Sequence, residues 1–309
     1  MSELLAQSIL SVAFWHSAIR LSVTTGTAAL GEVYAEKSGT VNIGLEGMVL
    51  TGAFFGAVGS YYTNSPWGGL LLAAVSGIVM ALIHSLVTVF LSANQVVAGT
   101  AINILAAGIT TFLNGILLKH VSNIPTFSNF AIPGLSRIPF VGEIFFDQNI
   151  FVYLLYVMIF VTWFLMKKTR LGLYLRTVGE NPKAADSQGI SVIRTKLTGM
   201  MICGVLAAIG GSFMPLFQLG LFSQNMSGGR GFIALAVVIV GGWKPSLSVL
   251  TALLFGMVEA FTYTFQTCYP EVPYQMVMML PYIITIVVYV FMTGKAKAPA
   301  ALAIPYEKE

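Results

Sequence analysis

Apolar runs alternate with short polar segments along nearly the whole chain. Most of these runs are about 17–25 residues long, the length that an α-helix needs to cross roughly 30 Å of hydrocarbon. The predicted membrane spans are residues 12–34, 43–63, 67–91, 95–118, 150–166, 196–219, 230–243, 246–267 and 273–293. The first span contains charged residues and the seventh is too short to cross alone, so the pattern fits eight to ten spans.

The composition agrees with this pattern. Of the 309 residues, 56% are hydrophobic and only 9% are charged, whereas soluble domains carry about 25% charged residues. A β-barrel would alternate apolar and polar residues in segments of about ten, and this chain does not. We therefore predict an all-α polytopic integral membrane protein in which residues 1–309 form a single transmembrane domain.

The basic residues predict the orientation in the membrane. The formal net charge is +4, but the basic side chains lie beside apolar spans, which argues against a nucleic-acid partner. Lys and Arg are concentrated in the loop 167–196 and recur in the tail 294–309, so the positive-inside rule predicts that both are cytoplasmic. The long loop 119–149, whose charges nearly balance, is then expected on the outside.

Two glycine-rich stretches, one in each half of the chain, interrupt the apolar pattern. Broken helices at membrane depth are typical of translocation sites, often in folds with an inverted repeat. We therefore expect residues 39–47 and 225–231 to act as pathway or hinge. For residues 52–59 we expect close helix packing, because Gly52 and Gly56 match the small-xxx-small pattern.

Polar side chains inside the apolar runs are candidates for a transport pathway. A charge in hydrocarbon costs about 2.5–3.5 kcal/mol on insertion scales, so such a group usually faces a cavity or a partner. Glu46 and Glu259 are the carboxylates that we place inside apolar runs, and Glu46 is the stronger candidate. The predicted path residues are Asn42, Glu46, Asn103, Asn225 and Arg230. The alternative for each of them is a hydrogen bond that only holds two helices together.

The cysteines and histidines do not form a metal-binding pattern. Cys203 lies inside an apolar run and Cys268 near the end of another, so a disulfide between them is not expected. His16, His84 and His120 share no metal-like spacing. We expect no metal and no cofactor.

The segment Arg176–Ile190, "RTVGENPKAADSQGI", is the most polar run of its length. Asn181 is a good N-cap and Pro182 suits the first helical position, so a short helix should begin here and end at Gly189. Ala184 and Ala185 carry no bulky side chain, so another protein could approach this helix closely. An amphipathic connector on the lipid headgroups is the alternative.

Four segments of the chain resemble the permease subunits of ATP-binding-cassette (ABC) importers for nucleosides and simple sugars. They are "GEVYAEKSGTVNIGLEGMVLTGA", "NQVVAGTAINILAAGIT", "GLYLRTVGENPKAADSQGI" and "GGRGFIALAVVIVGGWKP". The resemblance implies that residues 179–190 form the coupling helix, which sits in a groove of the ATPase subunit. The residues that match its motif are Gly179, Glu180, Asn181, Pro182, Ala184, Ala185 and Gly189. Thr177 departs from it, because alanine is more usual there.

The resemblance also implies an assembly in a bacterial cytoplasmic membrane. Two permease subunits, identical or different, line the path, an ATPase subunit drives it, and a substrate-binding lipoprotein or periplasmic protein delivers the cargo. The form "SGTVNIGLEGM" is closer to the nucleoside branch than to ribose-type permeases. The chain has no nucleotide-binding motif of the form GxxxxGK[ST], so we expect ATP hydrolysis in the partner and no enzyme activity in this chain.

Three other classes of membrane protein were weighed. An ion-coupled secondary transporter could use Glu46 or Glu259 as its coupling site. A membrane-embedded enzyme is disfavoured because we find no HExxH motif and no paired carboxylates on one helix. A channel would not need a docking helix.

Overall fold

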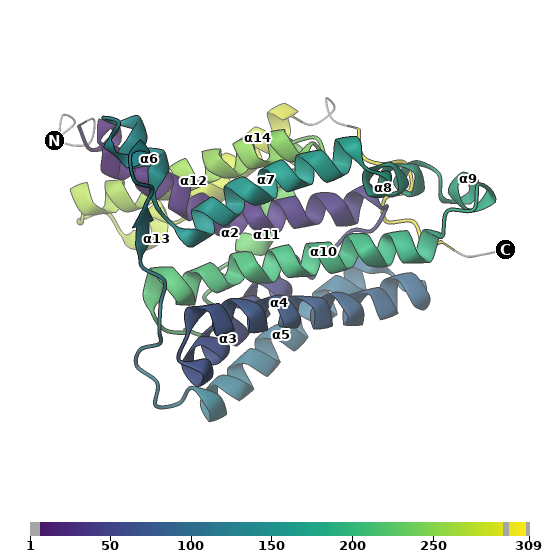
Figure 1. The fold of residues 1–309 in the computed structure, drawn as a ribbon, viewed down its shortest axis with the longest axis horizontal. Coiled ribbons are helices and arrows are strands. Elements are labelled where there is room, and N and C mark those ends of the chain that lie inside the picture. Colours follow the sequence, from purple (N-terminus) through teal and green to yellow (C-terminus); the bar gives the residue numbers. More distant parts are fainter. Residues whose placement is uncertain (1–6, 293–296, 307–309) are drawn as a thin grey trace.

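The computed structural model describes residues 7–292 and 297–306 and is dominated by helices (Figure 1). In chain order the helices are α2 Val12–Lys37, α3 Leu45–Thr63, α4 Pro66–Ser85, α5 Gln95–Leu117, α6 Val141–Phe146, α7 Ile150–Lys168, α8 Arg170–Glu180, α9 Pro182–Ser187, α10 Val192–Phe213, α11 Arg230–Val240, α12 Pro245–Cys268, α13 Tyr274–Val277 and α14 Leu280–Met292. Two π-helical turns, η1 Leu86–Phe90 and η3 Met214–Leu219, extend α4 and α10, and η2 Leu135–Arg137 is a 3-10 turn. Within the described residues, the sheet consists of β1 Asn129–Ala131 and β2 Asp147–Asn149, paired antiparallel.

The helices confirm the prediction of an all-α polytopic membrane protein. Each predicted span coincides with one helix, apart from 273–293, which holds both α13 and α14. In the described part of the chain, five helices are long and apolar enough to cross a membrane: Pro66–Phe90, Gln95–Leu117, Ile150–Lys168, Val192–Leu219 and Pro245–Cys268. α11 has 11 residues. At about 1.5 Å per residue it cannot cross alone, as predicted.

Local signals in the sequence set the starts of several helices. The Asn94 side chain accepts hydrogen bonds from the backbone amides of Val96 and Val97, and so caps α5. Asn149 caps α7 in the same way. These side chains satisfy amides that have no partner within the helix. The helix of the predicted span 95–118 therefore begins directly after Asn94.

Small residues allow the central helices to approach closely. Gly52 on α3 faces Ala208 on α10, where a Cβ atom on Gly52 would overlap the Ala208 backbone. A Cβ on Gly56 would lie 2.8 Å from the Cβ of Ser212, again on α10. The predicted packing role of residues 52–59 is confirmed at both positions.

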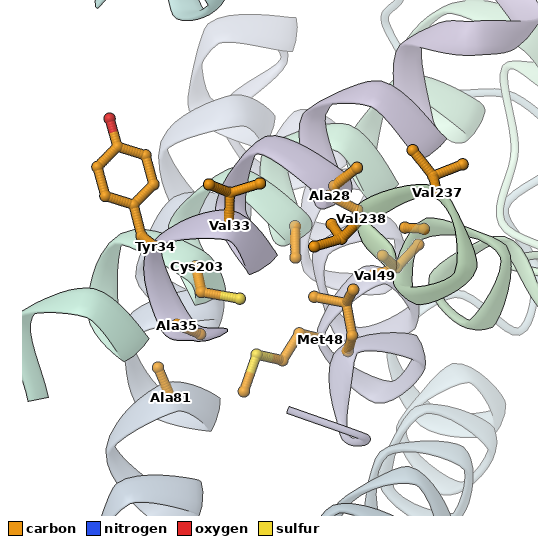
Figure 2. Close-up of a cluster of buried hydrophobic side chains, with 14 of the residues drawn as sticks. Ala28, Val33, Tyr34, Ala35, Met48, Val49, Ala81, Cys203, Val237 and Val238 are labelled. Carbon is orange, nitrogen blue, oxygen red and sulfur yellow. The ribbon is translucent and has the colours of Figure 1, made fainter. Parts of the chain in front are cut away.

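The core of the bundle lies around α2, which runs through the middle of the molecule (Figure 1). The second half of this helix, from Ser22 to Glu36, is buried without interruption. Figure 2 shows a buried cluster, to which α2 contributes Val33 and Tyr34, α3 Met48, α10 Cys203 and α11 Val238. Because neighbouring helices surround α2, it can carry charged groups that a lipid-facing helix could not.

The connecting segments lie at opposite ends of the bundle. The end that holds α6, the two strands and the start of α2 is on the left of Figure 1, and α8, α9 and the C-terminal segment are on the right. The amide of Ala301 donates to the carbonyl of Gly179 at 2.8 Å, so the C-terminal segment packs on α8. The loops 119–149 and 167–196 therefore lie at opposite ends of the bundle.

Candidate functional site

Two broken segments meet inside the bundle through one carboxylate. Glu46, in the first turn of α3, accepts hydrogen bonds from the backbone amides of Gly229 at 2.9 Å and Gly231 at 2.7 Å. These amides belong to the start of α11, where helical N–H groups lack partners and the helix dipole favours a negative charge. Glu46 thus joins the starts of α3 and α11, which lie far apart in the sequence.

The side chain of Asn103, on α5, binds backbone groups at the first of these breaks, the one between α2 and α3. Its Oδ1 accepts from the Gly47 amide at 2.7 Å, and its Nδ2 donates to the Ile43 carbonyl at 2.9 Å. The side chain therefore uses both its acceptor and its donor on the backbone around the start of α3. It satisfies groups that the break would otherwise leave unpaired.

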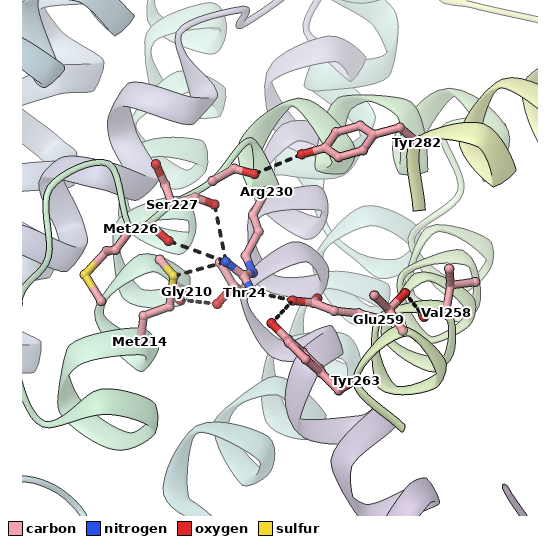
Figure 3. Close-up of polar contacts among 12 residues, drawn as sticks. Thr24, Gly210, Met214, Met226, Ser227, Arg230, Val258, Glu259, Tyr263 and Tyr282 are labelled. Atoms are coloured by element: carbon pink, nitrogen blue, oxygen red, sulfur yellow. Dashed lines mark hydrogen bonds and ion pairs between the residues drawn. The ribbon is translucent and has the colours of Figure 1, made fainter. Parts of the chain in front are cut away.

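Arg230, at the first position of α11, forms an ion pair with Glu259 of α12. The Tyr263 hydroxyl donates to the same carboxylate oxygen at 3.4 Å. Arg230 also donates to the carbonyl of Met226 at 3.4 Å, and the Tyr282 hydroxyl donates to the carbonyl of Gly228 at 3.2 Å. Figure 3 shows these side chains converging from three helices and the preceding turn.

A cavity of about 250 Å³ lies at this cluster. Its lining combines polar groups with aromatic and apolar ones. The lining residues include Thr25, Met226, Arg230, Phe255, Glu259, Tyr263, Met278 and Tyr282. We call it the inner cavity. Such a mixture of apolar walls and a few convergent polar groups is typical of small-molecule sites.

A second cavity, of about 500 Å³, lies further toward the α6 end, and we call it the outer cavity. Tyr263 lines both cavities. Ser17, Arg20 and Leu21 of α2 line the outer cavity, and Thr25 of the same helix lines the inner one. The two cavities thus follow one another along α2.

The other two predicted path residues lie outside these cavities. Asn225 is exposed in the turn before α11, with φ at +54°. Asn42 is fully buried, and its Nδ2 lies 3.3 Å from the Met48 sulfur and 3.4 Å from the Cys203 sulfur. Arg230 lines the inner cavity and Glu46 binds the backbone on either side of it, whereas Asn103 binds the backbone at the start of α3.

A buried polar cluster on α2 was missed by the sequence reasoning. Glu32 and Glu36 lie one turn apart, 0% and 3% exposed, so the expectation that no helix carries paired carboxylates was wrong. Trp243 donates its indole N–H to Glu36, and the Cys203 thiol donates to Glu32 at 3.2 Å. The signal was the four-residue spacing in "GEVYAEK", which places both carboxylates on one side of α2.

The polar segment after α7 forms the helix that its sequence predicts. The Asn181 side chain accepts from the Ala184 amide at 3.0 Å, α9 begins at Pro182, and Gly189 follows with φ at +79°. Glycine suits this left-handed conformation because it has no Cβ. The predicted start and end of the helix are confirmed.

The two alanines of α9 have different surroundings. Ala185 is fully buried and packs with Val178, Val192 and Tyr306. Ala184 is exposed, so α9 presents it to the outside. Only Ala184 has the open surroundings that we expected of both residues.

The segment α8–α9 touches the first helix break directly. A Cβ atom on Gly179 would overlap the carbonyl of Lys37, at the end of α2, and would lie 3.3 Å from the Gly39 amide. Gly39 itself has φ at +82°. Backbone packs on backbone here, so a displacement of α8–α9 reaches residues 38–44 without an intervening side chain.

No group of three or more His, Cys, Asp or Glu side chains in the described part of the chain is placed to hold a metal ion.

The family is decided by sequence comparison. The profile of the family described as branched-chain amino acid transport system, permease component, matches residues 16–289. The chain belongs to this permease family. The permease is therefore a membrane-embedded transport subunit, and the predicted resemblance is confirmed.

Several curated relatives of the permease cover nearly all of it. The guanosine ABC transporter permease protein NupQ of Bacillus subtilis is 36% identical over 292 residues, 91% of this chain and 92% of the relative. The nucleoside ABC transporter permease protein NupC of Lactococcus lactis is 35% identical over 291 residues, again 91% and 92%. The putative glucose ABC transporter permease protein TsgC13 of Haloferax volcanii is 35% identical over 236 residues, 75% of this chain and 71% of the relative. No solved structure is significantly similar. These relatives favour an ABC transporter subunit over an ion-coupled carrier.

Proposed function

We propose that the permease forms half of the translocation path of an ABC importer for nucleosides. Its cargo passes through the outer and inner cavities along α2. The observation that carries this proposal is that the two cavities follow one another along α2 and share Tyr263. Arg230 and Glu259 line the inner one. The two relatives that cover 91% of the chain bear the names of guanosine and nucleoside permeases.

The chemistry of the inner cavity suits an uncharged polar molecule. Glu259 compensates the charge of Arg230. The cavity therefore offers hydrogen-bonding groups but no net positive charge that would attract an anion such as a nucleotide. A dehydrated base edge or ribose hydroxyl needs such donors and acceptors. The ring of Tyr263, 41% exposed, and that of Tyr282, 49% exposed, can stack on a planar base. A simple sugar is the second candidate, since one relative is a putative glucose permease.

ATP hydrolysis in a partner subunit drives the path through residues 179–190, the coupling helix of the proposal. The ATPase docks on the exposed residues at the start of α9, which are Ala184 of the helix itself and Glu180 and Asn181 directly before it. A push on α9 is transmitted through Gly179 to the break at residues 38–44, where Asn103 and Glu46 hold the starts of α3 and α11. The break and the inner cavity then move together.

The remaining parts of the assembly follow from the same proposal. Residues 1–309 form one transmembrane domain, with α9 and the tail in the cytoplasm of a bacterial cell and the loop 119–149 outside. A second permease subunit, identical or different, completes the path. A substrate-binding lipoprotein or periplasmic protein delivers the cargo at the α6 end. Asn42 lies in the break before α3 and Asn225 in the turn before α11, and both residues gate the path.

Protection of an engineered cysteine tests the proposed cargo site. In a Cys268→Ser background, Tyr263→Cys places a thiol between the two cavities, and Thr267→Cys, one turn further along α12 and exposed, serves as the control. In membranes containing the assembled transporter, nucleosides should slow maleimide labelling of Tyr263→Cys and leave Thr267→Cys unchanged. Protection by glucose or ribose alone would redirect the proposal to a sugar. Equal labelling with every ligand would remove the cavity from the path.

A further inference from the structure

A third cavity, of about 350 Å³, lies at the α9 end of the bundle and shares no lining residue with the inner or outer cavity. Four basic residues line it: Lys37, Lys167, Arg176 and Lys244. Trp163 and Trp243 form part of its wall. We call it the basic cavity. It brings together the ends of α2 and α7, one side of α8 and the start of α12.

The basic groups of the basic cavity outnumber the carboxylates that the protein places beside them. Among residues 7–292 and 297–306, none of its four basic groups forms an ion pair with a carboxylate. The Lys167 ammonium lies 5.9 Å from the centre of the Trp163 ring, and Arg176 donates its Nε–H to the carbonyl of Gly172 at 3.1 Å. Glu180 and Glu36 lie near enough to attract Lys37, but neither forms an ion pair with it, and Glu36 is buried and accepts the indole N–H of Trp243. Four cations around one hollow repel each other unless an anion joins them.

The place of the cavity in the membrane indicates which anion this is. α7 spans the apolar layer and ends at Lys168, and its outer face exposes large apolar side chains. These side chains are Val157, Phe160, Val161, Trp163 and Phe164. Trp is enriched where membrane helices reach the headgroups. The basic cavity therefore lies where the headgroup of a lipid packed along α7 would reach.

We propose that the basic cavity binds the phosphate of an anionic phospholipid, whose acyl chains lie along the outer face of α7. Basic pockets between membrane helices recognise such headgroups, and each basic side chain near an anionic surface strengthens binding about fivefold. A free phosphate would satisfy the charges but would gain nothing from the apolar face of α7. An acidic segment of the ATPase would also satisfy them, but it would leave that face uncovered.

Two neighbouring lysines provide a matched test. Lys167 lines the cavity, whereas Lys168 is the next residue, equally basic and exposed, and does not line it. The full-length permease is purified in mild detergent and titrated with phosphatidylglycerol, phosphatidylcholine or inorganic phosphate. Native mass spectrometry counts retained lipids, and the thermal melting temperature reports stabilisation by each ligand.

The proposal expects phosphatidylglycerol to be retained and to raise the melting temperature of the wild type and of Lys168→Gln. The double variant Lys167→Gln/Lys244→Gln should bind it about 30-fold more weakly, from the loss of two basic contacts. Equal weakening in Lys168→Gln would reduce the effect to general surface charge and overturn the proposal. So would equal retention of phosphatidylcholine, stabilisation by inorganic phosphate alone, or protection that appears only when the ATPase subunit is added.

Discussion

At the scale of single residues, charge compensation decides which polar groups this bundle can hold. Glu46 accepts two backbone amides, and Arg230 forms an ion pair with Glu259. An uncompensated charge at membrane depth costs about 2.5–3.5 kcal/mol even on the lower scales. A substitution that removes one partner should therefore cost more than one that removes both.

The first prediction concerns the ion pair of the inner cavity. Glu259→Gln leaves Arg230 without its carboxylate. Breaking a buried pair costs about 3–5 kcal/mol, and we expect the lower end because the side chains of Arg230 and Glu259 retain 17% and 21% exposure. The double variant Arg230→Gln/Glu259→Gln should be more stable than Glu259→Gln in thermal unfolding of the detergent-solubilised permease. Strictly additive effects of the two substitutions would show that the groups do not interact.

A second prediction separates the structural role of Glu46 from a role as a proton or ion site. Glu46→Gln keeps one acceptor oxygen and loses one charge-assisted hydrogen bond to the start of α11. It should lower the stability of the permease by about 2 kcal/mol, with ATP-driven uptake reduced in proportion to the folded protein. Glu143→Gln, an exposed acid on α6, is the control and should change neither. Full stability combined with lost uptake would instead support direct participation of the carboxylate in transport.

At the scale of helices and breaks, local signals in the sequence sufficed for some elements and failed for others. Asn181, Pro182 and Gly189 predict α9 because a cap, a first-turn proline and a terminating glycine act within a few residues. That Ala185 faces inward could not be predicted, because its burial depends on Val178, Val192 and Tyr306. The bonds of Glu46 join residues more than 180 positions apart. Sequence reasoning found Glu46 as a candidate but had no means to find its partner.

The two alanines of α9 give a third prediction. Ala184→Trp adds bulk on the exposed side of the helix, so the permease should fold normally but lose the ATPase subunit. Ala184→Ser, which stays small, is its control. Ala185→Trp has no room inside the cluster with Val178 and Val192 and should lower the melting temperature of the permease itself. The measurements are co-purification of the ATPase with the tagged permease and thermal unfolding. Full recovery of the ATPase with Ala184→Trp would contradict the assignment of α9 as the docking helix.

The contact between α8 and the first break gives a fourth prediction. Gly179→Ala pushes against the Lys37 carbonyl, so it should displace the break while leaving the exposed side of α9 intact. ATPase should still co-purify, but uptake per bound ATPase should fall. Gly108→Ala, at a helix position with open space around it, is the control. It should be neutral or stabilising by about 0.5–1 kcal/mol, from helix propensity alone. Unchanged uptake in Gly179→Ala would show that coupling follows another route.

At the scale of the whole molecule, α2 connects the parts of the mechanism. Its first half lines the outer cavity, Thr25 lines the inner one, and its second half holds the buried Glu32–Glu36 cluster. Its last residue, Lys37, meets Gly179, the first residue of the proposed coupling helix. The outer and inner cavities thus lie toward the α6 end, whereas the part of α2 nearer the α9 end is buried and bonds to Cys203 and Trp243 through Glu32 and Glu36. This arrangement fits a path that is open to cargo on one side and closed on the side of the ATPase.

The most direct test of this account is guanosine uptake by the purified transporter, with all of its subunits, in liposomes. The account predicts that uptake requires ATP, is unaffected by ionophores, is inhibited by other nucleosides but not by nucleotides, and is lost in Ala184→Trp. Guanosine uptake that continues without ATP and collapses when an ionophore dissipates the ion gradient would contradict it. That result would identify the intramembrane carboxylates as ion-coupling sites instead.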